Sequence, residues 1–208
     1  MVQNIPDTRI NFRTKRCICR EMTREDVYER CAWGPYDNAL LSYYAFNFDK
    51  EHKKRALYYR WKGMKREWFS FDLGETGTLI GILSLRRIRR IVRTARLGLV
   101  IKPEHVNRGY GTEIVKGFMK YYFTEMGFRR LFLDVAEFNK RALHCYKKCG
   151  FVSCGAFDRE YPGSYDIIHT EEYRNSEDCF FFRDGRLYAR YTDMTLSRKE
   201  WEQKVAGP

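Results

Sequence analysis

Residues 110–150 contain the pattern that most restricts the fold, an apolar strand enclosed by two helices. Apolar side chains recur at helical spacing on one face of residues 110–126. Residues 130–135 form an apolar run of the kind that is buried inside a sheet. A second helix, over residues 139–150, begins with an asparagine cap and ends at a glycine. This order predicts a sheet with helices packed on its faces.

Patterns on either side of this unit extend the predicted sheet. Thr23 and Asp26 resemble a capping box that begins a helix, and residues 38–61 are predicted to be helical in one or two pieces. The other predicted strands are residues 16–21, 67–73, 79–87, 95–101, a strand from Phe151, and 186–194 after the Asp184-Gly185 turn. The expected fold class is α/β (α+β), a single domain over residues 1–208 with its core at about 16–195.

Composition excludes a membrane span and predicts a cytoplasmic protein. No run approaches the roughly 18 apolar residues that a membrane helix needs. Residues 1–8 contain no apolar segment typical of a signal peptide. Seven cysteines without a CxxC pair predict reduced thiols. His144, Cys145 and Cys149 lie close together, but no ligand set with metal-site spacing completes them, so no metal is expected.

Charge is distributed unevenly along the chain. The net charge of +12 suits an anionic ligand such as a phosphate, and it also suits RNA or a ribosome. Six arginines between Arg86 and Arg96 are typical of a solvated hairpin, with RNA or an acidic partner as the alternative. Residues 157–180 carry seven acids against two arginines, a net charge of −5, together with three tyrosines. This segment is either a disordered acidic loop or a surface for a cation.

Two segments carry the candidate chemistry. In residues 106–112 (VNRGYGT), Gly109 and Gly111 allow a tight turn into a helix whose free N–H groups can bind phosphate. No Gly-Lys-Ser/Thr follows, so this is not a Walker A loop. In residues 139–151, Asn139, Ala142 and Tyr146 fall close to one helix face, where they form either a cap with a packed tyrosine or a binding surface.

Together these segments resemble the GNAT superfamily of N-acetyltransferases. The glycine turn is similar to its pyrophosphate loop, and Asn139-x-x-Ala142-x-x-x-Tyr146-x-x-x-Gly150-Phe151 is similar to its second signature. The turn at residues 33–35 and the LIGILSLRRI strand resemble the branch of ribosomal-protein and spermidine acetyltransferases. The resemblance implies a mostly antiparallel, twisted sheet that is splayed in the middle.

The sequence departs from the family pattern at three positions. The family loop usually has Gln or Arg where this chain has Val106, and Gly where it has Asn107. Relatives often carry Glu, a candidate general base, where Arg96 stands. The resemblance therefore leaves the base unassigned, and Asp134 and Glu137 are the remaining candidates.

The implied reaction is direct transfer of the acetyl group of acetyl-CoA to a primary amine. Tyr146 is expected to serve the leaving thiolate, with Asn139 beside it. A backbone N–H near Val100 is expected to stabilise the carbonyl oxygen. The residues expected to bind acetyl-CoA are Val100, Ile101, Asn107, Arg108, Gly109, Tyr110, Gly111, Thr112, Asn139, Ala142 and Tyr146.

The partners remain less defined than the reaction. A cationic acceptor, such as a polyamine or a protein N-terminus, would suit the acidic residues 157–180. A catalytically inactive RNA- or ribosome-binding protein and an acyl-CoA sensor are the alternatives. RNA is the weaker candidate partner, no membrane partner is expected, and a homodimer is left open.

Overall fold

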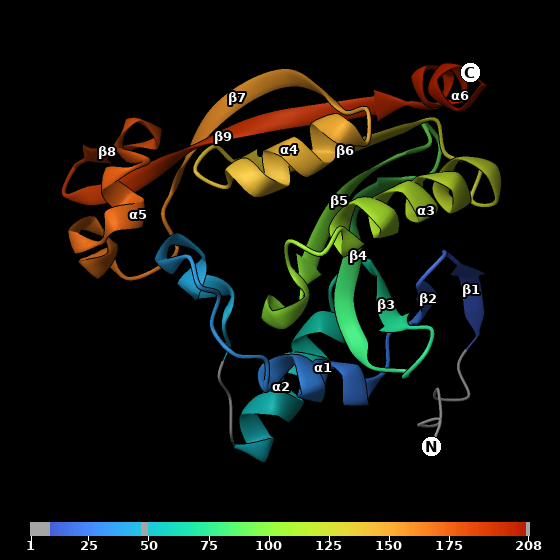
Figure 1. Ribbon diagram of the computed structural model, residues 1–208, viewed down its shortest axis with the longest axis horizontal. Coiled ribbons are helices and arrows are strands. Elements are labelled where there is room, and N and C mark those ends of the chain that lie inside the picture. The colour runs from blue at the N-terminus through green and yellow to red at the C-terminus, as the bar shows by residue number, and fades with distance from the viewer. Residues whose placement is uncertain (1–8, 47–49, 207–208) are drawn as a thin grey trace.

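The computed structural model describes residues 9–46 and 50–206 and places nine strands there in one sheet (Figure 1). The strands are β1 (Ile10–Arg13), β2 (Cys17–Glu21), β3 (Glu67–Leu73), β4 (Leu79–Arg89), β5 (Thr94–Ile101), β6 (Arg130–Ala136), β7 (Val152–Glu160), β8 (Phe180–Arg183) and β9 (Arg186–Ser197). Their order across the sheet is β1-β2-β3-β4-β5-β6-β9-β7, with β8 paired to β9. Every predicted strand is therefore present, and β1 and β8 are additional.

The helices fall between the strands much as predicted. The α-helices are α1 (Arg24–Cys31), α2 (Glu51–Lys62), α3 (Tyr110–Thr124), α4 (Lys140–Lys148), α5 (Glu171–Arg174) and α6 (Arg198–Ala206). Short 3₁₀ helices are η1 (Ala39–Tyr44), η2 (Pro103–His105), η3 (Tyr165–His169) and η4 (Glu177–Cys179). No helix in the described part of the chain is long and apolar enough to cross a membrane.

Predicted and observed boundaries agree in some places and differ in others. The region expected to be helical in one or two pieces over residues 38–61 is two pieces, η1 and α2, and residues 47–49 between them lie outside the described residues. The helix expected over residues 110–126 ends at Thr124. The ordered core also extends beyond residues 16–195 at both ends, through β1 and α6.

The sheet separates in its middle, as the resemblance implied. All strand pairs are antiparallel except β5 and β6, which run parallel. Their pairing begins at Thr94 and Arg130 and stops at Leu97 and Leu133. Beyond these residues β5 continues beside β4 and β6 continues beside β9. A gap therefore opens between two strands that each keep a partner on the outer edge.

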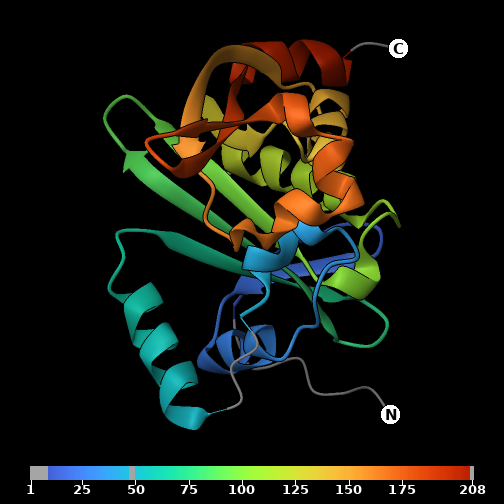
Figure 2. The same cartoon turned by 90° about the vertical axis from the view of Figure 1, so that its left-hand side faces the viewer.

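Helices cover the two faces of the sheet (Figure 2). The main core packs α3, through buried side chains such as Ile114 and Phe118, against β3, β4 and β5. On the opposite face, Trp61 of α2 stacks on Trp68 of β3, with ring centroids 4.5 Å apart. We call the first the helix α3 face and the second the helix α2 face.

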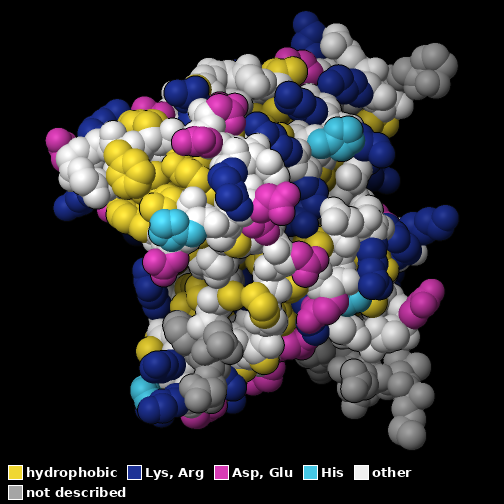
Figure 3. Space-filling model, turned by 60° about the vertical axis from the view of Figure 1, so that its left-hand side comes forward, with side chains coloured by type: hydrophobic (Ala, Val, Ile, Leu, Met, Phe, Trp, Pro, Cys, Tyr) yellow, Lys and Arg dark blue, Asp and Glu magenta, His cyan; other side chains and the backbone are white. Residues whose placement is uncertain are grey.

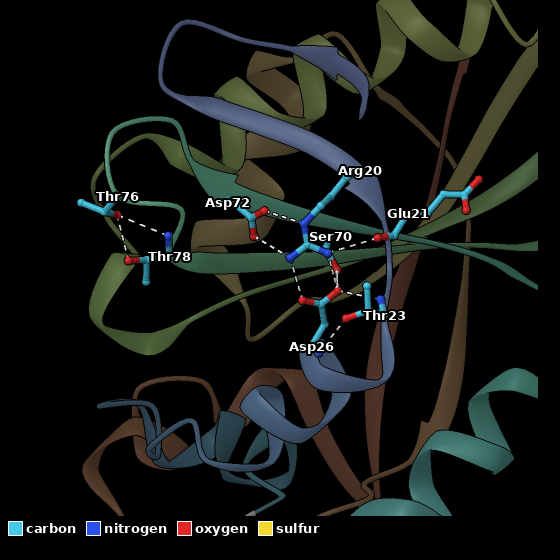
Figure 4. Close-up of polar contacts among 8 residues, drawn as sticks. All are labelled: Arg20, Glu21, Thr23, Asp26, Ser70, Asp72, Thr76 and Thr78. Atoms are coloured by element: carbon cyan, nitrogen blue, oxygen red, sulfur yellow. Dashed lines mark hydrogen bonds and ion pairs between the residues drawn. The ribbon is translucent and has the colours of Figure 1, made fainter. Parts of the chain in front are cut away.

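A buried ion network joins α1 to the sheet (Figure 4). The Arg20 guanidinium donates to Asp26 Oδ2 at 2.6 Å and to Asp72 Oδ2 at 2.6 Å, and both carboxylates are almost fully buried. Asp26 also accepts from the Thr23 N–H and from Ser70 Oγ at 2.7 Å. Burial would raise the pKa of Asp26, but these donors outweigh it and lower that pKa. The predicted capping box is thus confirmed, and it is also an anchor for α1.

Removing the cation of this network should destabilise the fold strongly. Arg20→Met leaves Asp26 and Asp72 buried beside each other without a counter-ion, so the free energy of unfolding should fall by about 3–5 kcal/mol. Urea unfolding would measure the change. Arg24→Met is the matched control, because Arg24 pairs with Glu25 in solvent and its loss should leave the free energy of unfolding nearly unchanged. Equal, small effects of the two substitutions would contradict the role of the network.

Candidate active site

A cavity of about 690 Å³ occupies the gap between β5 and β6 and opens to both faces of the sheet. On the helix α3 face it is lined by the start of α3 and by α4, and on the helix α2 face by Trp68, Ser84 and Arg86. Such a volume is typical of a ligand pocket. The cavity therefore connects the two segments singled out in the sequence with a second group of side chains from β3 and β4.

The glycine turn has the backbone geometry of an anion site. Gly109 adopts φ +79° and is the N-cap of α3, with no side-chain hydrogen bond to the cap. The first bond of the helix joins Glu113 N–H to the Gly109 carbonyl at 3.1 Å. The N–H groups of Tyr110, Gly111 and Thr112 precede it and have no helical acceptor. They are thus available, at the positive end of the helix dipole, for a phosphate.

The backbone conformation at Asn107 explains why the family prefers glycine there. Its φ of +61° is in the left-handed region, where glycine is unstrained and asparagine is among the best tolerated of the other residues. The departure from the family pattern at this position therefore preserves the turn. Arg108, in contrast, lines a separate surface hollow beside Pro35 and Glu104 rather than the main cavity.

A set of hydrogen bonds around Glu113 and Arg16, which the sequence did not predict, holds this turn in place. Glu113 accepts hydrogen bonds from Thr14 Oγ1 at 2.7 Å and from the Arg16 Nε at 2.6 Å. Burial would raise the pKa of Glu113, but these hydrogen bonds lower it. Arg16 also donates to the Arg108 carbonyl at 3.1 Å and lies 4.1 Å from the Tyr110 ring centroid. The contacts join residues almost a hundred positions apart, so no local spacing could have predicted them.

Helix α4 brings its predicted residues to the same cavity. Asn139, Ala142 and Tyr146 all line it. Asn139 Oδ1 accepts from Ala142 N–H at 3.1 Å, so the oxygen acts as the N-cap and only the NH₂ group is left for a ligand. The Tyr146 side chain is 8% exposed, and burial raises the pKa of its phenol well above the ordinary value. Tyr146 is therefore a protonated hydrogen-bond donor at neutral pH.

The predicted residues of β5 lie at the cavity wall. Val100 and Ile101 both line it, beyond the last residue of β5 that pairs with β6. The Ile101 carbonyl accepts a hydrogen bond from Tyr36 Oη at 2.6 Å. Thr112 also lines the cavity and contacts Cys145 Sγ through its hydroxyl at 3.4 Å. Tyr110 is not part of the lining and only its backbone faces the predicted phosphate site.

The two candidate bases occupy different environments. Asp134 lines the cavity, yet its side chain is 5% exposed and pairs with Arg86, with Arg96 at 3.1 Å and with Arg159 at 3.2 Å. Arg96 also pairs with Asp193 at 2.6 Å. Asp134 and Asp193 lie directly opposite each other on β6 and β9, so Arg96 relieves their repulsion. This is the local reason for arginine where relatives often have Glu.

Glu137 lies outside the cavity. Its Oε1 accepts a hydrogen bond from Thr192 Oγ1 at 2.9 Å, and it does not contribute to the lining. Neither candidate base therefore has a carboxylate that is free inside the cavity. Their roles stay predictions, and the geometry adds no support to them.

The acidic segment is folded, and its described acids do not line the cavity. Residues 157–180 contain η3, α5 and η4, and Ile167 and Tyr173 pack into a second core with β8 and β9. From this segment only Arg159 and Pro162 line the cavity, so none of its described acids does. On the face shown in Figure 3, Lys and Arg side chains are scattered among Asp and Glu side chains rather than gathered into one stripe.

Comparisons with known proteins agree with this geometry. The family described as acetyltransferase (GNAT) domain matches residues 16–152. The chain is 35% identical to the spermidine N(1)-acetyltransferase of Vibrio cholerae serotype O1 over 83 residues, 40% of this chain and 48% of that protein. It is 33% identical to the Escherichia coli K12 spermidine N(1)-acetyltransferase over 106 residues, 50% of this chain and 54% of that protein. The matched segments thus span about half the length of these relatives.

A solved structure extends the agreement to the fold. The spermidine N-acetyltransferase from Vibrio cholerae in complex with CoA and spermine superposes with a TM-score of 0.65 at 23% identity. The superposition covers 89% of this chain and 98% of that one. The family match includes both segments, the gap between β5 and β6, and most of the cavity wall. The chain therefore belongs to the GNAT acetyltransferase family.

Proposed function

We propose that the protein is an acetyl-CoA-dependent N-acetyltransferase that transfers the acetyl group directly to a primary amine. The observation that carries the proposal is the uncapped start of α3, which lies on the same cavity as Asn139 and Tyr146. Along this single cavity the anion site would take the pyrophosphate of acetyl-CoA. The gap between β5 and β6 would take the pantetheine arm, and the Tyr146 phenol would lie at the thioester.

The residues at each position suit the part of acetyl-CoA that they would contact. The N–H groups of Tyr110, Gly111 and Thr112 would bind the pyrophosphate, and a Cβ at Gly111 would already touch Cys145 Sγ at 3.7 Å. The amide groups of the pantetheine arm would pair with the inner edge of β5 at residues 98–101, which has no strand partner on the β6 side. The thioester would then lie beside Tyr146.

The transfer itself needs a neutral amine and a stabilised thiolate. The amine nitrogen attacks the thioester carbon, the carbon–sulfur bond breaks, and the nitrogen loses a proton as the thiolate becomes a thiol. A backbone N–H near Val100 would stabilise the carbonyl oxygen, and the Tyr146 hydroxyl would donate to the departing sulfur. Since neither Asp134 nor Glu137 has a free carboxylate in the cavity, we propose that the amine enters already neutral.

The acceptor is a primary amine of undetermined type. The two curated relatives act, by their names, on spermidine, so a polyamine is the first acceptor to test. The sequence analysis also favoured a cationic acceptor. The charges on the cavity wall favour another class of amine.

Filling the phosphate site should abolish tight cofactor binding. Gly111→Val adds two methyl groups to the gap between α3 and Cys145, so acetyl-CoA affinity should fall at least about tenfold, as expected for the loss of one charge-assisted hydrogen bond. Calorimetry with acetyl-CoA would measure it. Gly155→Val is the matched control, because a Cβ there meets nothing closer than 3.8 Å and Gly155 is outside the cavity. Unchanged affinity in a folded Gly111→Val variant would contradict the assigned site.

Removing the Tyr146 hydroxyl should slow acetyl transfer without weakening acetyl-CoA binding. Tyr146→Phe keeps the packing of the ring but removes the proposed donor to the thiolate, so kcat should fall by about 10²- to 10⁴-fold while acetyl-CoA affinity is retained. The rate of thiol release from acetyl-CoA, measured with an amine that the wild-type protein acetylates, would give kcat. Tyr59→Phe, at a side chain that is 63% exposed, should leave both quantities unchanged. A Tyr146→Phe rate within about twofold of the wild type would exclude the role.

A further inference from the structure

The cavity wall on the helix α2 face has an unusual charge. Its charged side chains, within the described ranges of the chain, are four arginines and one acid. They are Arg30, Arg66, Arg86, Arg159 and Asp134. This face is opposite the phosphate site at the start of α3, so these arginines are not needed for the pyrophosphate. They line the side from which an acceptor would reach the thioester.

Positive charge exceeds negative charge even after all ion pairs are counted. Asp134 is shared by three arginines, and the second carboxylate nearby, Asp193, pairs with one of the same three. Arg30 and Arg66 form no ion pair with any described carboxylate. Five guanidinium groups, with Arg96 included, thus face two carboxylates. Each pairing arginine uses only one of its terminal nitrogens for Asp134, so further donors remain.

Arg30 is the most informative of these side chains. It is 2% exposed, donates to the Tyr44 carbonyl, and lies 4.6 Å from the Trp33 ring centroid and 4.7 Å from that of Phe46. Burial lowers the pKa of this guanidinium, and no carboxylate among the described residues opposes the effect. A buried cation without a counter-ion is costly. An anionic group that enters the cavity would reduce that cost.

The surroundings of Arg86 show the same excess. Burial lowers the pKa of Arg86, and the neighbouring Arg96, Arg159 and Arg66 lower it further, against the opposing effect of Asp134. Guanidinium groups suit a carboxylate because their donors match its two oxygens. A polyamine would instead add two or more positive charges to this wall. Like charges brought together in a partly dry site repel each other.

The same wall is aromatic, which limits the size and type of the acceptor. Trp61 and Trp68 stack in parallel, and Tyr43, Tyr44 and Tyr191 also line the cavity. The cavity of about 690 Å³ must hold the pantetheine arm as well as the acceptor, so the acceptor is small. Aromatic rings contribute apolar surface and stacking rather than further charge.

We propose, on the basis of the acetyltransferase activity proposed above, that the acceptor is a small primary amine that also carries a carboxylate and an apolar side chain, an amino acid. The arginines of the helix α2 face bind the carboxylate, Trp61 and Trp68 contact the side chain, and the amine faces the gap between β5 and β6. The nitrogen–carbon bond forms as the carbon–sulfur bond breaks, giving an N-acetyl amino acid and CoA. The amine nitrogen loses one proton, and the CoA thiolate gains one to become the thiol.

Matched acceptors test the charge directly. Free L-amino acids with apolar or aromatic side chains are compared with their carboxamides, which keep the amine and the side chain but lack the negative charge, and with spermidine. The free amino acids should show kcat/KM roughly 10- to 100-fold above their carboxamides, as expected for a charge-assisted hydrogen bond. Carboxamides that react equally well, or spermidine as the better acceptor, would overturn the proposal.

Substitution of Arg66 tests where the carboxylate of the acceptor binds. Arg66 is exposed, and the contact of its guanidinium within the described ranges is with the Trp68 ring, 5.6 Å from the centroid, so Arg66→Gln should not disturb folding. KM for amino acids should rise about tenfold, with KM for carboxamides and for acetyl-CoA unchanged. Arg60→Gln, an exposed arginine of α2 outside the cavity, is the matched control. Equal changes for amino acids and carboxamides in Arg66→Gln would contradict carboxylate binding there.

The acetyltransferase activity and the identity of the acceptor can be excluded separately. Acetylation of spermidine or of carboxamides without acetylation of amino acids would remove this inference and leave the acetyltransferase intact. Failure of every amine to release thiol from acetyl-CoA would remove the proposed function, and this inference with it. Calorimetry with acetyl-CoA alone, run on the same preparation, shows that the protein tested is folded and competent to bind.

Discussion

The site depends on the point at which two parallel strands stop pairing. β5 and β6 share hydrogen bonds only from Thr94 and Arg130 to Leu97 and Leu133. Beyond this point β5 keeps its ladder with β4 as far as Ile101, and β6 keeps its ladder with β9. The separation therefore leaves only the inner edges without strand partners. Buried backbone groups require partners, so the gap is suited to a ligand that carries amide groups of its own.

A row of charges crosses the sheet where the strands separate. Arg86 on β4, Arg96 on β5 and Arg159 on β7 all pair with Asp134 on β6, and Arg96 also pairs with Asp193 on β9. Asp134 thereby links both halves of the divided sheet through side chains instead of backbone hydrogen bonds. The same row supplies positive charge to one side of the cavity. The side chains that support the divided sheet are thus also ones that we propose to recognise the acceptor.

Much of the fold could be predicted from the sequence because its signals are local. The capping box at Thr23, the cap at Asn139 and the left-handed Gly150 each follow from residues a few positions apart. β1 was missed because Ile10–Arg13 is short and lies at the edge of the sheet. The helix α3 ends two residues before the predicted end, because helix ends depend on packing as well as on caps.

The site was predictable only where a motif specified it. The turn at Gly109 and the Asn139–Tyr146 segment reach the same cavity as expected. Arg108 was expected to bind the cofactor, but it lines the neighbouring hollow beside Pro35 and Glu104 and not the main cavity. The arginines of the helix α2 face come from α1, β4, β7 and the loop before β3. No spacing in the sequence relates them, so only the fold shows that they share a wall.

Amide hydrogen exchange with and without acetyl-CoA tests the central claim most directly. The claim is that the cofactor occupies the gap between β5 and β6 and the uncapped start of α3. Acetyl-CoA should slow exchange at Tyr110, Gly111 and Thr112 and at those N–H groups of residues 98–101 that point away from β4, because these amides gain acceptors that the protein does not provide. Exchange that is unchanged there, or slowed only elsewhere, such as at the hairpin of residues 89–94, would contradict the account.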